Sequence, residues 1–317
     1  MSSTSPQPVG AAGTAPASTV TETASPTLVW LALGIVYVVW GSTYLAIRVA
    51  VETMPPLLMG AARFIVAGSL LYAIARFRGA PSVRSLTRAQ LGASWLVGSL
   101  LVAGGNGVVN VAEQYIPSSL AALVISSVPL WVVVMRRVTG ERVPVLTLAS
   151  VGVGFCGVAL LLLPGGATDS GKPIGFVLVV CAAFSWALGS FTSRRLPLPS
   201  NALLSTSVQM LGGGLTMLVL GLALGEASDA HPSRFSGDSL LAFAYLIFIG
   251  SLIAYTAYVW LLQNAPISKV TTYAYVNPVV AIFLGWSILS EKVTPTTLLG
   301  AAVIISSVAV TVRRESG

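Results

Sequence analysis

The chain has 317 residues, of which 55% are apolar and 9% are charged, against roughly 25% charged in a typical soluble domain. Ten acids, seventeen bases and one histidine cannot cover the surface of a water-soluble particle of 32.7 kDa. The mean hydropathy of +0.86 therefore predicts an all-α, polytopic membrane protein and excludes an ordinary soluble enzyme. The net charge of +7 does not indicate nucleic-acid binding, because the bases lie scattered between apolar runs rather than on one face.

The N-terminal segment, residues 1–27, differs from the rest of the chain. It is rich in Ser, Thr, Ala and Pro, and Glu22 is its only charged residue. Such a composition cannot bury enough apolar surface to fold, so we expect a disordered cytoplasmic tail. A secretory signal needs a basic region and a mitochondrial presequence needs Arg, and the segment fits neither.

Ten apolar stretches follow, each about 20 residues long, which is the length that crosses a bilayer core. We predict a first five-helix unit over residues 28–163 and a second over residues 174–312. The ten predicted spans are 28–48, 57–77, 89–111, 117–138, 144–163, 174–194, 202–224, 239–262, 267–289 and 296–312.

The positions of the bases indicate the orientation. If both termini lie in the cytoplasm, twelve bases lie on the inner side, and the outer side keeps five: Arg48, Arg63, Lys172, Arg234 and Lys292. This excess follows the positive-inside rule and supports an even number of spans.

The two halves share a spacing pattern. A glutamine and two prolines recur at identical intervals, as Gln114, Pro117 and Pro129 and as Gln263, Pro266 and Pro278. An acid-base pair follows in each half, and because each unit has five spans the second must enter the membrane upside down. Such inverted repeats are typical of secondary transporters, which bind substrate near the midplane between the halves.

Several short motifs resemble one known family. They are Trp40-Gly41-Ser42-Thr43-Tyr44, Arg63-Phe64, Ser185-Trp186-Ala187-Leu188-Gly189-Ser190 and Tyr275-Val276-Asn277-Pro278, with Glu291 behind them. With them the chain after residue 28 resembles the EamA-type branch of the drug/metabolite transporter superfamily, and within it the bacterial amino-acid and metabolite exporters. The resemblance implies ten helices, a central cavity, alternating access, efflux and a place in the bacterial inner membrane.

The ninth span carries the clearest polar stripe. Lys269, Tyr273 and Asn277 follow at intervals of four and share one helix face, whereas the matching first-half positions, Leu120, Val124 and Val128, are apolar. Polar side chains in a bilayer normally face the bundle or a cavity, so we expect a substrate-binding stripe. Lys269 would then attract a carboxylate, although it could instead extend toward the headgroups while Tyr273 packs between helices.

Aromatic and amide side chains give further candidate substrate contacts. Trp40 and Tyr44 lie near one face of the first span, and Trp186 lies in the sixth. The repeat offset makes Asn106 in the third span equivalent to Tyr255 in the eighth. Amphipathic rings suit aromatic or zwitterionic solutes, although both the rings and the amide can serve helix packing alone.

Pro129 and Pro278 lie at equivalent positions and each removes one backbone hydrogen bond, which predicts paired kinks that act as hinges or as static bends. The acids Glu141 and Glu291 precede the fifth and tenth spans, where a negative charge stabilises the start of a helix.

No Asp, Glu or His lies near the middle of a predicted span, and such groups commonly relay protons in pumps. We therefore expect facilitated or loosely coupled transport, with Glu113 and Glu52 at the outer mouth as the only alternatives. A G-x-G-x-x-G match at Gly152, Gly154 and Gly157 lies inside a span and indicates no nucleotide site. We expect no cofactor and no metal.

The sequence thus predicts an exporter of small organic metabolites, with amino acids or amphipathic analogues as the favoured cargo. One alternative is an uptake or exchange carrier for phosphorylated or sugar-linked anions, which would need more bases in the cavity. A membrane-embedded enzyme or sensor is an alternative of another class, against which the missing catalytic groups and output domain argue. The oligomeric state stays open, and a monomer is compatible with the sequence.

Overall fold

The computed structural model describes residues 25–161, 171–265, 270 and 272–315, and these residues form helices, turns and loops without a strand. The first half contains α1 (Pro26–Ala50), α2 (Pro56–Phe77), η1 (Val83–Ser85), α3 (Arg88–Gly98), η2 (Ser99–Gly107), α4 (Val108–Ala112), α5 (Ser118–Ile125), α6 (Val128–Val138) and α7 (Val145–Leu161). The second half contains α8 (Pro173–Ser193), α9 (Ala202–Ala223), η4 (Glu226–Ser228), η5 (Pro232–Arg234), α10 (Gly237–Tyr245), η6 (Leu246–Ile253), α11 (Ala254–Asn264), α13 (Tyr273–Leu289) and α14 (Pro295–Glu315). The expected tail falls outside the described residues up to residue 24.

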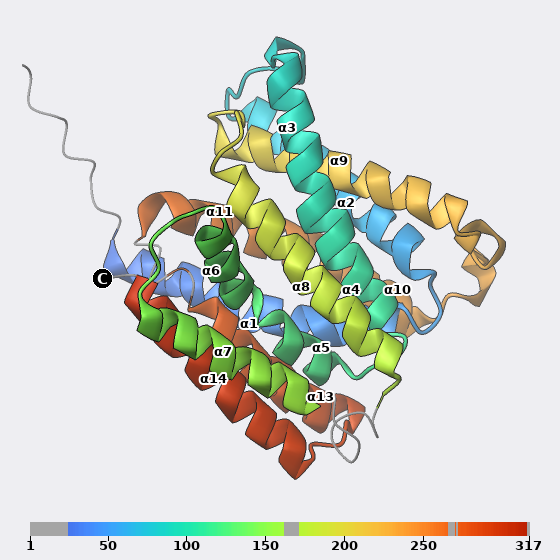
Figure 1. Cartoon of the computed structure of the whole chain (residues 1–317). Coiled ribbons are helices and arrows are strands. Elements are labelled where there is room, and N and C mark those ends of the chain that lie inside the picture. Colours follow the sequence, from blue (N-terminus) through green and yellow to red (C-terminus); the bar gives the residue numbers. More distant parts are fainter. Residues whose placement is uncertain (1–24, 162–170, 266–269, 271, 316–317) are drawn as a thin grey trace, which may run out of the picture.

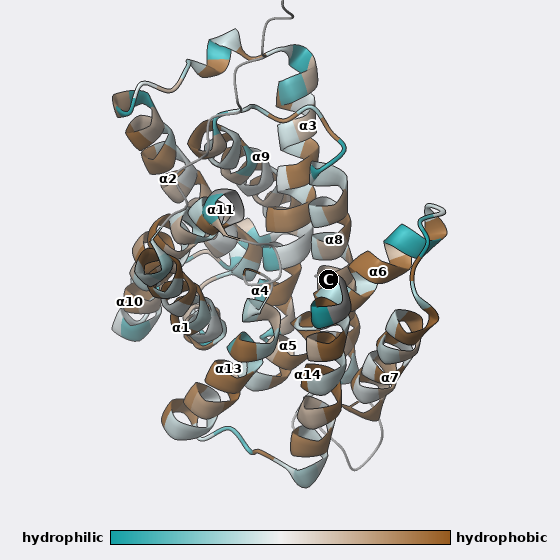
Figure 2. Ribbon diagram, turned by 90° about the vertical axis from the view of Figure 1, so that its left-hand side faces the viewer, coloured by the Kyte–Doolittle hydropathy of each residue, from teal (hydrophilic) through white to brown (hydrophobic). Residues whose placement is uncertain are grey.

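Described helices lie within all ten predicted spans, although the start of the ninth, residues 267–269 and 271, lies outside the described residues. Within the described chain, eight helical stretches are long and apolar enough to cross a membrane, and α7 and α13 are shorter apolar helices. Hydrophobic residues line the helices, and hydrophilic ones gather mainly at helix ends and connections (Figure 2). Large apolar side chains such as Phe283 and Trp286 are exposed on the outside, where lipid can solvate them. The protein is an all-helical, polytopic membrane protein.

Local sequence signals explain where the helices begin. Prolines open α2, α8 and α14, where a missing N–H costs nothing because the first turn has no internal partner for it. Thr87 and Gln90 form a reciprocal cap at the start of α3, and Asn201 accepts a hydrogen bond of 3.0 Å from the Leu204 N–H at the start of α9. These helices therefore begin within a residue or two of the starts predicted for their spans.

Helices that correspond in the two repeats pack against each other. α2 packs along α9, and α7 lies beside α14 at one edge of the bundle (Figure 1). α1 packs on α11 and α13, while its counterpart α8 packs on η2, α4, α5 and α6. A pseudo-two-fold axis between the repeats produces this pattern, because it carries each contact onto its equivalent. α1 and α8 thus contribute to the contact between the halves in equivalent ways.

Among the described residues, three spans depart from a regular α-helix near their middle. η2 and η6 are π-helical stretches, in which the backbone bonds run from residue i to i+5, and they interrupt the third and eighth spans at corresponding places. The fourth span breaks at Ser126 and Ser127, so that Pro129 lies in the first turn of α6, where its missing N–H is tolerated. α13 runs as one helix through Pro278. The paired kinks stay a prediction: a helix break lies just before Pro129, and Pro278 lies within a continuous helix.

Candidate functional site

A central cavity lies between helices of both halves. About 90 Å³ of it is wide enough for the centre of a water molecule, which is room for several waters in the closed arrangement described here. Seven residues predicted from the sequence border it: Trp40, Tyr44, Asn106, Trp186, Tyr255, Tyr273 and Asn277. Pro278 also borders the cavity, whereas Pro129 is not among its lining residues. Lys269, the remaining candidate, lies outside the described residues.

Four aromatic rings from α8, α11 and α13 surround Trp40 of α1. Its ring centroid lies 4.8 Å from Tyr258, 5.3 Å from Tyr273, 5.9 Å from Tyr255 and 6.4 Å from Trp186. Ring pairs at such distances contribute about 0.5–1.5 kcal/mol each beyond their burial. Trp40, Tyr255, Tyr273 and Trp186 also border the cavity, so these rings both hold the helices together and offer π-faces to a solute.

Two glycines let the cavity helices approach closely. A Cβ on Gly41 of α1 would lie 2.6 Å from the Val280 Cβ, and one on Gly105 of η2 would lie 2.7 Å from Cε3 of Trp186. Any larger residue would therefore displace α13 or the Trp186 ring. The small residues beside the aromatic motifs thus set the width of the site.

The polar stripe on α13 has a packing role as well as a place in the cavity wall. Asn277 is buried, and with its amide nitrogen turned toward the neighbouring carbonyls it donates to Tyr37 at 3.2 Å and to Tyr273 at 3.3 Å. The Tyr37 hydroxyl contacts the hydroxyl of Thr272. Asn277 therefore connects α13 to α1. Within the part of the chain that the structure describes, the Asn106 amide makes one long contact, of 3.5 Å with the Leu101 carbonyl, so it remains able to bind a solute.

Arg63 is a functional candidate that the sequence analysis counted among the outer bases. It lies inside the α2 span, 4% exposed, and borders the cavity. Its Nε donates to the Ser251 hydroxyl of η6 at 2.9 Å, its guanidinium carbon lies 4.6 Å from the Phe64 ring centre, and Nη1 has no hydrogen-bond partner among the described residues. The sequence does place this base six residues inside an apolar span. A charged residue at such a position normally has a functional role, so its position could have identified it.

At one end of the bundle, Glu291 connects the two halves. Its carboxylate accepts hydrogen bonds from the Ser118 N–H and hydroxyl, both at 2.8 Å, and from the Ser119 N–H at 3.1 Å and its hydroxyl. Gly285 leaves room for this carboxylate, because a Cβ there would lie 2.4 Å from Oε2. Contrary to the expectation from sequence, Glu291 stabilises the start of α5 rather than of its own helix α14, since these N–H groups lack partners within α5.

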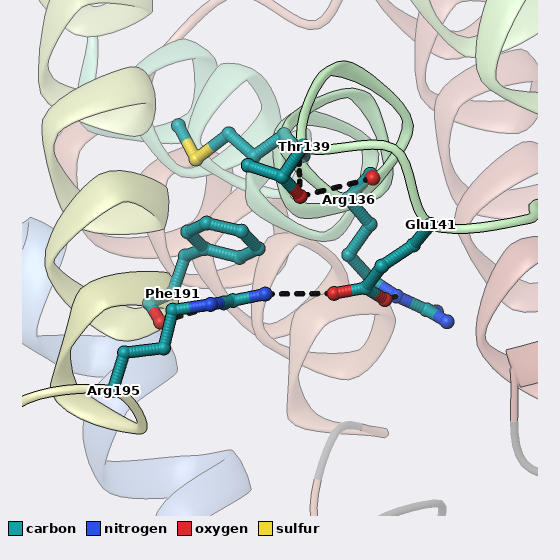
Figure 3. Close-up of polar contacts among 6 residues, drawn as sticks. Arg136, Thr139, Glu141, Phe191 and Arg195 are labelled. Atoms are coloured by element: carbon teal, nitrogen blue, oxygen red, sulfur yellow. Dashed lines mark hydrogen bonds and ion pairs between the residues drawn. The ribbon is translucent and has the colours of Figure 1, made fainter.

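The equivalent acid, Glu141, has different partners. Its carboxylate lies 2.6 Å from Arg136 Nε and 2.7 Å from Arg195 Nη2, and Arg195 stacks on the Phe191 ring (Figure 3). The hydrogen bond from Arg136 is the main reason that the pKa of Glu141 lies below its usual value. Contrary to the expectation from sequence, these contacts join α6 to the end of α8 rather than stabilise the start of α7.

The fold and the cavity define a class: a polytopic helical membrane protein with a central cavity between two related halves. The EamA-like transporter family matches residues 27–163 and again 173–313. The chain belongs to this family and is a multi-pass membrane transporter.

Named relatives agree with this membership. The chain is similar to the "Uncharacterized inner membrane transporter YedA" of Escherichia coli K12, with 39% identity over 87% of this chain and 88% of the relative. It is also similar to the "Probable amino-acid metabolite efflux pump" of the same strain, with 26% identity over 88% of this chain and 92% of the relative. A solved structure described as "Crystal structure of protein" covers 92% of this chain and 100% of its own, with a TM-score of 0.62 and 20% identity, which shows a shared fold.

Proposed function

We propose that the protein exports small organic metabolites that carry one carboxylate next to an apolar or aromatic body, amino acids foremost, across the inner membrane. The main observation behind this proposal is the position of Arg63. A buried guanidinium with an unpartnered Nη1 at the cavity wall is costly unless an anion pairs with it. A solute carboxylate fits because a guanidinium binds it through two parallel hydrogen bonds.

The rest of the cavity wall suits the other parts of an amino acid. The faces of Trp40, Tyr255 and Tyr273 offer π-surfaces for an ammonium group or an aromatic side chain, and Asn106 offers an amide. Arg63 is the one basic side chain among the described lining residues. One base favours a single carboxylate over a doubly charged phosphoryl group, so the export of amino acids is preferred over the carriage of phosphorylated anions.

Alternating access supplies the mechanism of the proposal. The units 28–163 and 174–312 rock against each other about the cavity, with both termini in the cytoplasm. The cross-repeat contacts of Glu291 then close the outer end in the arrangement described above, and rocking must break them to release substrate. Pro278 and the break before Pro129 are the proposed points of bending, because each lacks a backbone hydrogen bond.

Counterflow in proteoliposomes tests the proposal. Vesicles loaded with unlabelled phenylalanine receive labelled phenylalanine or labelled phenylalaninamide, which lacks the carboxylate. We expect saturable exchange of the amino acid, and Arg63→Gln is expected to lower its apparent affinity by about tenfold to a hundredfold, as for the loss of a charged hydrogen bond of 1.5–3 kcal/mol. Exchange of the amide is expected to change little.

Ser251→Ala is the matched control, because it removes the hydrogen bond that Arg63 makes within the protein and leaves the guanidinium in place. If Arg63→Gln weakens acid and amide equally, Arg63 has a packing role. If the wild-type protein exchanges none of a panel of amino acids, the proposed cargo is wrong.

A further inference from the structure

Glu113 is a buried acid that the mechanism above does not use. It follows the last residue of α4, at the end of the third span, and is 0% exposed, although sequence reasoning placed it at the outer mouth. Neither carboxyl oxygen has a hydrogen-bond partner among the described residues. Glu52, the other acid expected at that mouth, is exposed in the turn after α1.

The charged and titratable neighbours of Glu113 come from α1 and from the other half. Tyr44 and Arg48 lie one turn apart on α1, and the Arg48 guanidinium donates to the backbone carbonyl of Glu113 rather than to its carboxyl group. Glu291 is close enough to act on it electrostatically, and its own carboxylate is engaged by the start of α5. Lys172, further along, is exposed and stands over the Tyr115 ring. The described contacts thus give the Glu113 carboxylate no cation partner.

An ionised carboxylate in this position is strongly disfavoured. Removing it from water without a partner costs far more than burying a neutral carboxylic acid, and a second carboxylate nearby adds repulsion. Burial accordingly holds the pKa of Glu113 well above its usual value, the charge of Glu291 raises it further, and the charge of Arg48 opposes both. The neutral, protonated acid is the form that this arrangement accommodates.

We propose that Glu113 is a proton-binding site that is occupied while the Glu291 end is closed and emptied when that end opens. The inference rests on the proposed alternating access. Separation of Glu291 from Ser118 and Ser119 admits water to Glu113 and frees the Arg48 guanidinium. The O–H bond of the acid then breaks, its proton passes to water on that side, and the resulting carboxylate pairs with Arg48. Reclosure requires a proton to return to the same oxygen.

This site would also couple transport through the cavity to the proton gradient across the membrane. Tyr44 borders the cavity and lies near Glu113, so a solute beside Tyr44 and the proton on Glu113 occupy adjoining positions on α1. Transport would therefore respond to a pH gradient, in contrast to the facilitated transport expected from the sequence. The acid lies at the end of a span rather than its middle, which is why a search of span centres misses it.

Infrared difference spectroscopy tests the protonation directly. Purified wild-type protein, Glu113→Gln and Glu52→Gln are compared at neutral pH, where ordinary carboxyl groups are ionised. We expect a carboxylic-acid C=O band that the wild type and Glu52→Gln share and that Glu113→Gln lacks. Absence of the band from the wild type at neutral pH would overturn the proposal whether or not the protein transports amino acids.

Proteoliposomes test the coupling. For each variant, amino-acid uptake with an imposed pH gradient is divided by the uptake of the same variant without a gradient. We expect a ratio of severalfold for wild type and Glu52→Gln and a ratio near one for Glu113→Gln. A wild-type ratio in Glu113→Gln would overturn the coupling role. Absence of wild-type uptake would reject the proposed cargo, and the infrared comparison would still decide whether Glu113 holds a proton.

Discussion

The two ends of the bundle present the same residue of the repeat in two different settings. Both acids are half-buried, but Glu291 is held by backbone and hydroxyl groups of the other half, whereas Glu141 lies between two arginines. Among the described residues, no arginine forms a hydrogen bond or ion pair with Glu291. The acid was retained in both repeats, and its surroundings decide what it does.

The difference between these two acids shows that equivalent positions of two similar repeats can form different contacts. In an inverted repeat, opening one end and closing the other exchanges the conformations of the two halves. The segment that would correspond to Ser118 and Ser119 lies at residues 267–268, outside the described part of the chain. We therefore expect Glu141 to exchange its arginine contacts for others when the cavity faces the other side. The following substitutions test how far the two ends differ.

Glu291→Ala should have the largest effect. It removes the acceptor for two N–H groups and two hydroxyl groups at the start of α5, and we expect a loss of about 2 kcal/mol, as for a charged helix cap. Thermal unfolding in detergent measures this as a lower Tm. Glu141→Ala is the matched control, and an equal drop in both variants would contradict the asymmetry.

Ser118→Ala should have an intermediate effect. It removes the hydroxyl bond to Glu291 but leaves the Ser118 N–H bond in place, so we expect about 1 kcal/mol and a correspondingly smaller drop in Tm. A double-mutant cycle with Glu291→Gln separates this contact from others. Additive effects of the two substitutions would mean that the contact does not hold the end closed.

Glu141→Gln should have the smallest effect on stability. The pKa of Glu141 is depressed in the folded protein, so its stabilising contribution is present above the usual pKa of Glu, about 4.3, and is lost as the pH falls through the lower folded value. The difference in Tm between wild type and Glu141→Gln should be small at neutral pH, shrink with added salt and vanish in acid. A large difference that salt leaves unchanged would show that the Glu141 end is also closed by a buried contact.

The sequence predicts most of the fold because bilayer thickness translates directly into apolar length, and α1 and α9 begin and end within two residues of the predicted limits. The repeat spacing also predicts the aromatic wall, since it places Asn106 and Tyr255 at equivalent depths and both border the cavity. Arg63 and Glu113 could be read only as outer charges, because their burial depends on neighbours far away in the chain. The partner of Glu291 is hidden for the same reason: the start of α5 lies more than 170 residues earlier.

The π-helical turns of η2 and η6 give the third and eighth spans a property that rigid rods lack. Each turn accommodates one residue more than α-geometry allows, so moving the excess along the helix by one residue rotates the passed residue by about 100° without breaking the span. Asn106 lies in one such stretch, and Tyr255 is the second residue after the other. Such a shift would turn a residue of the cavity wall toward a bound solute or away from an empty cavity. The preceding helices α3 and α10 would not need to move.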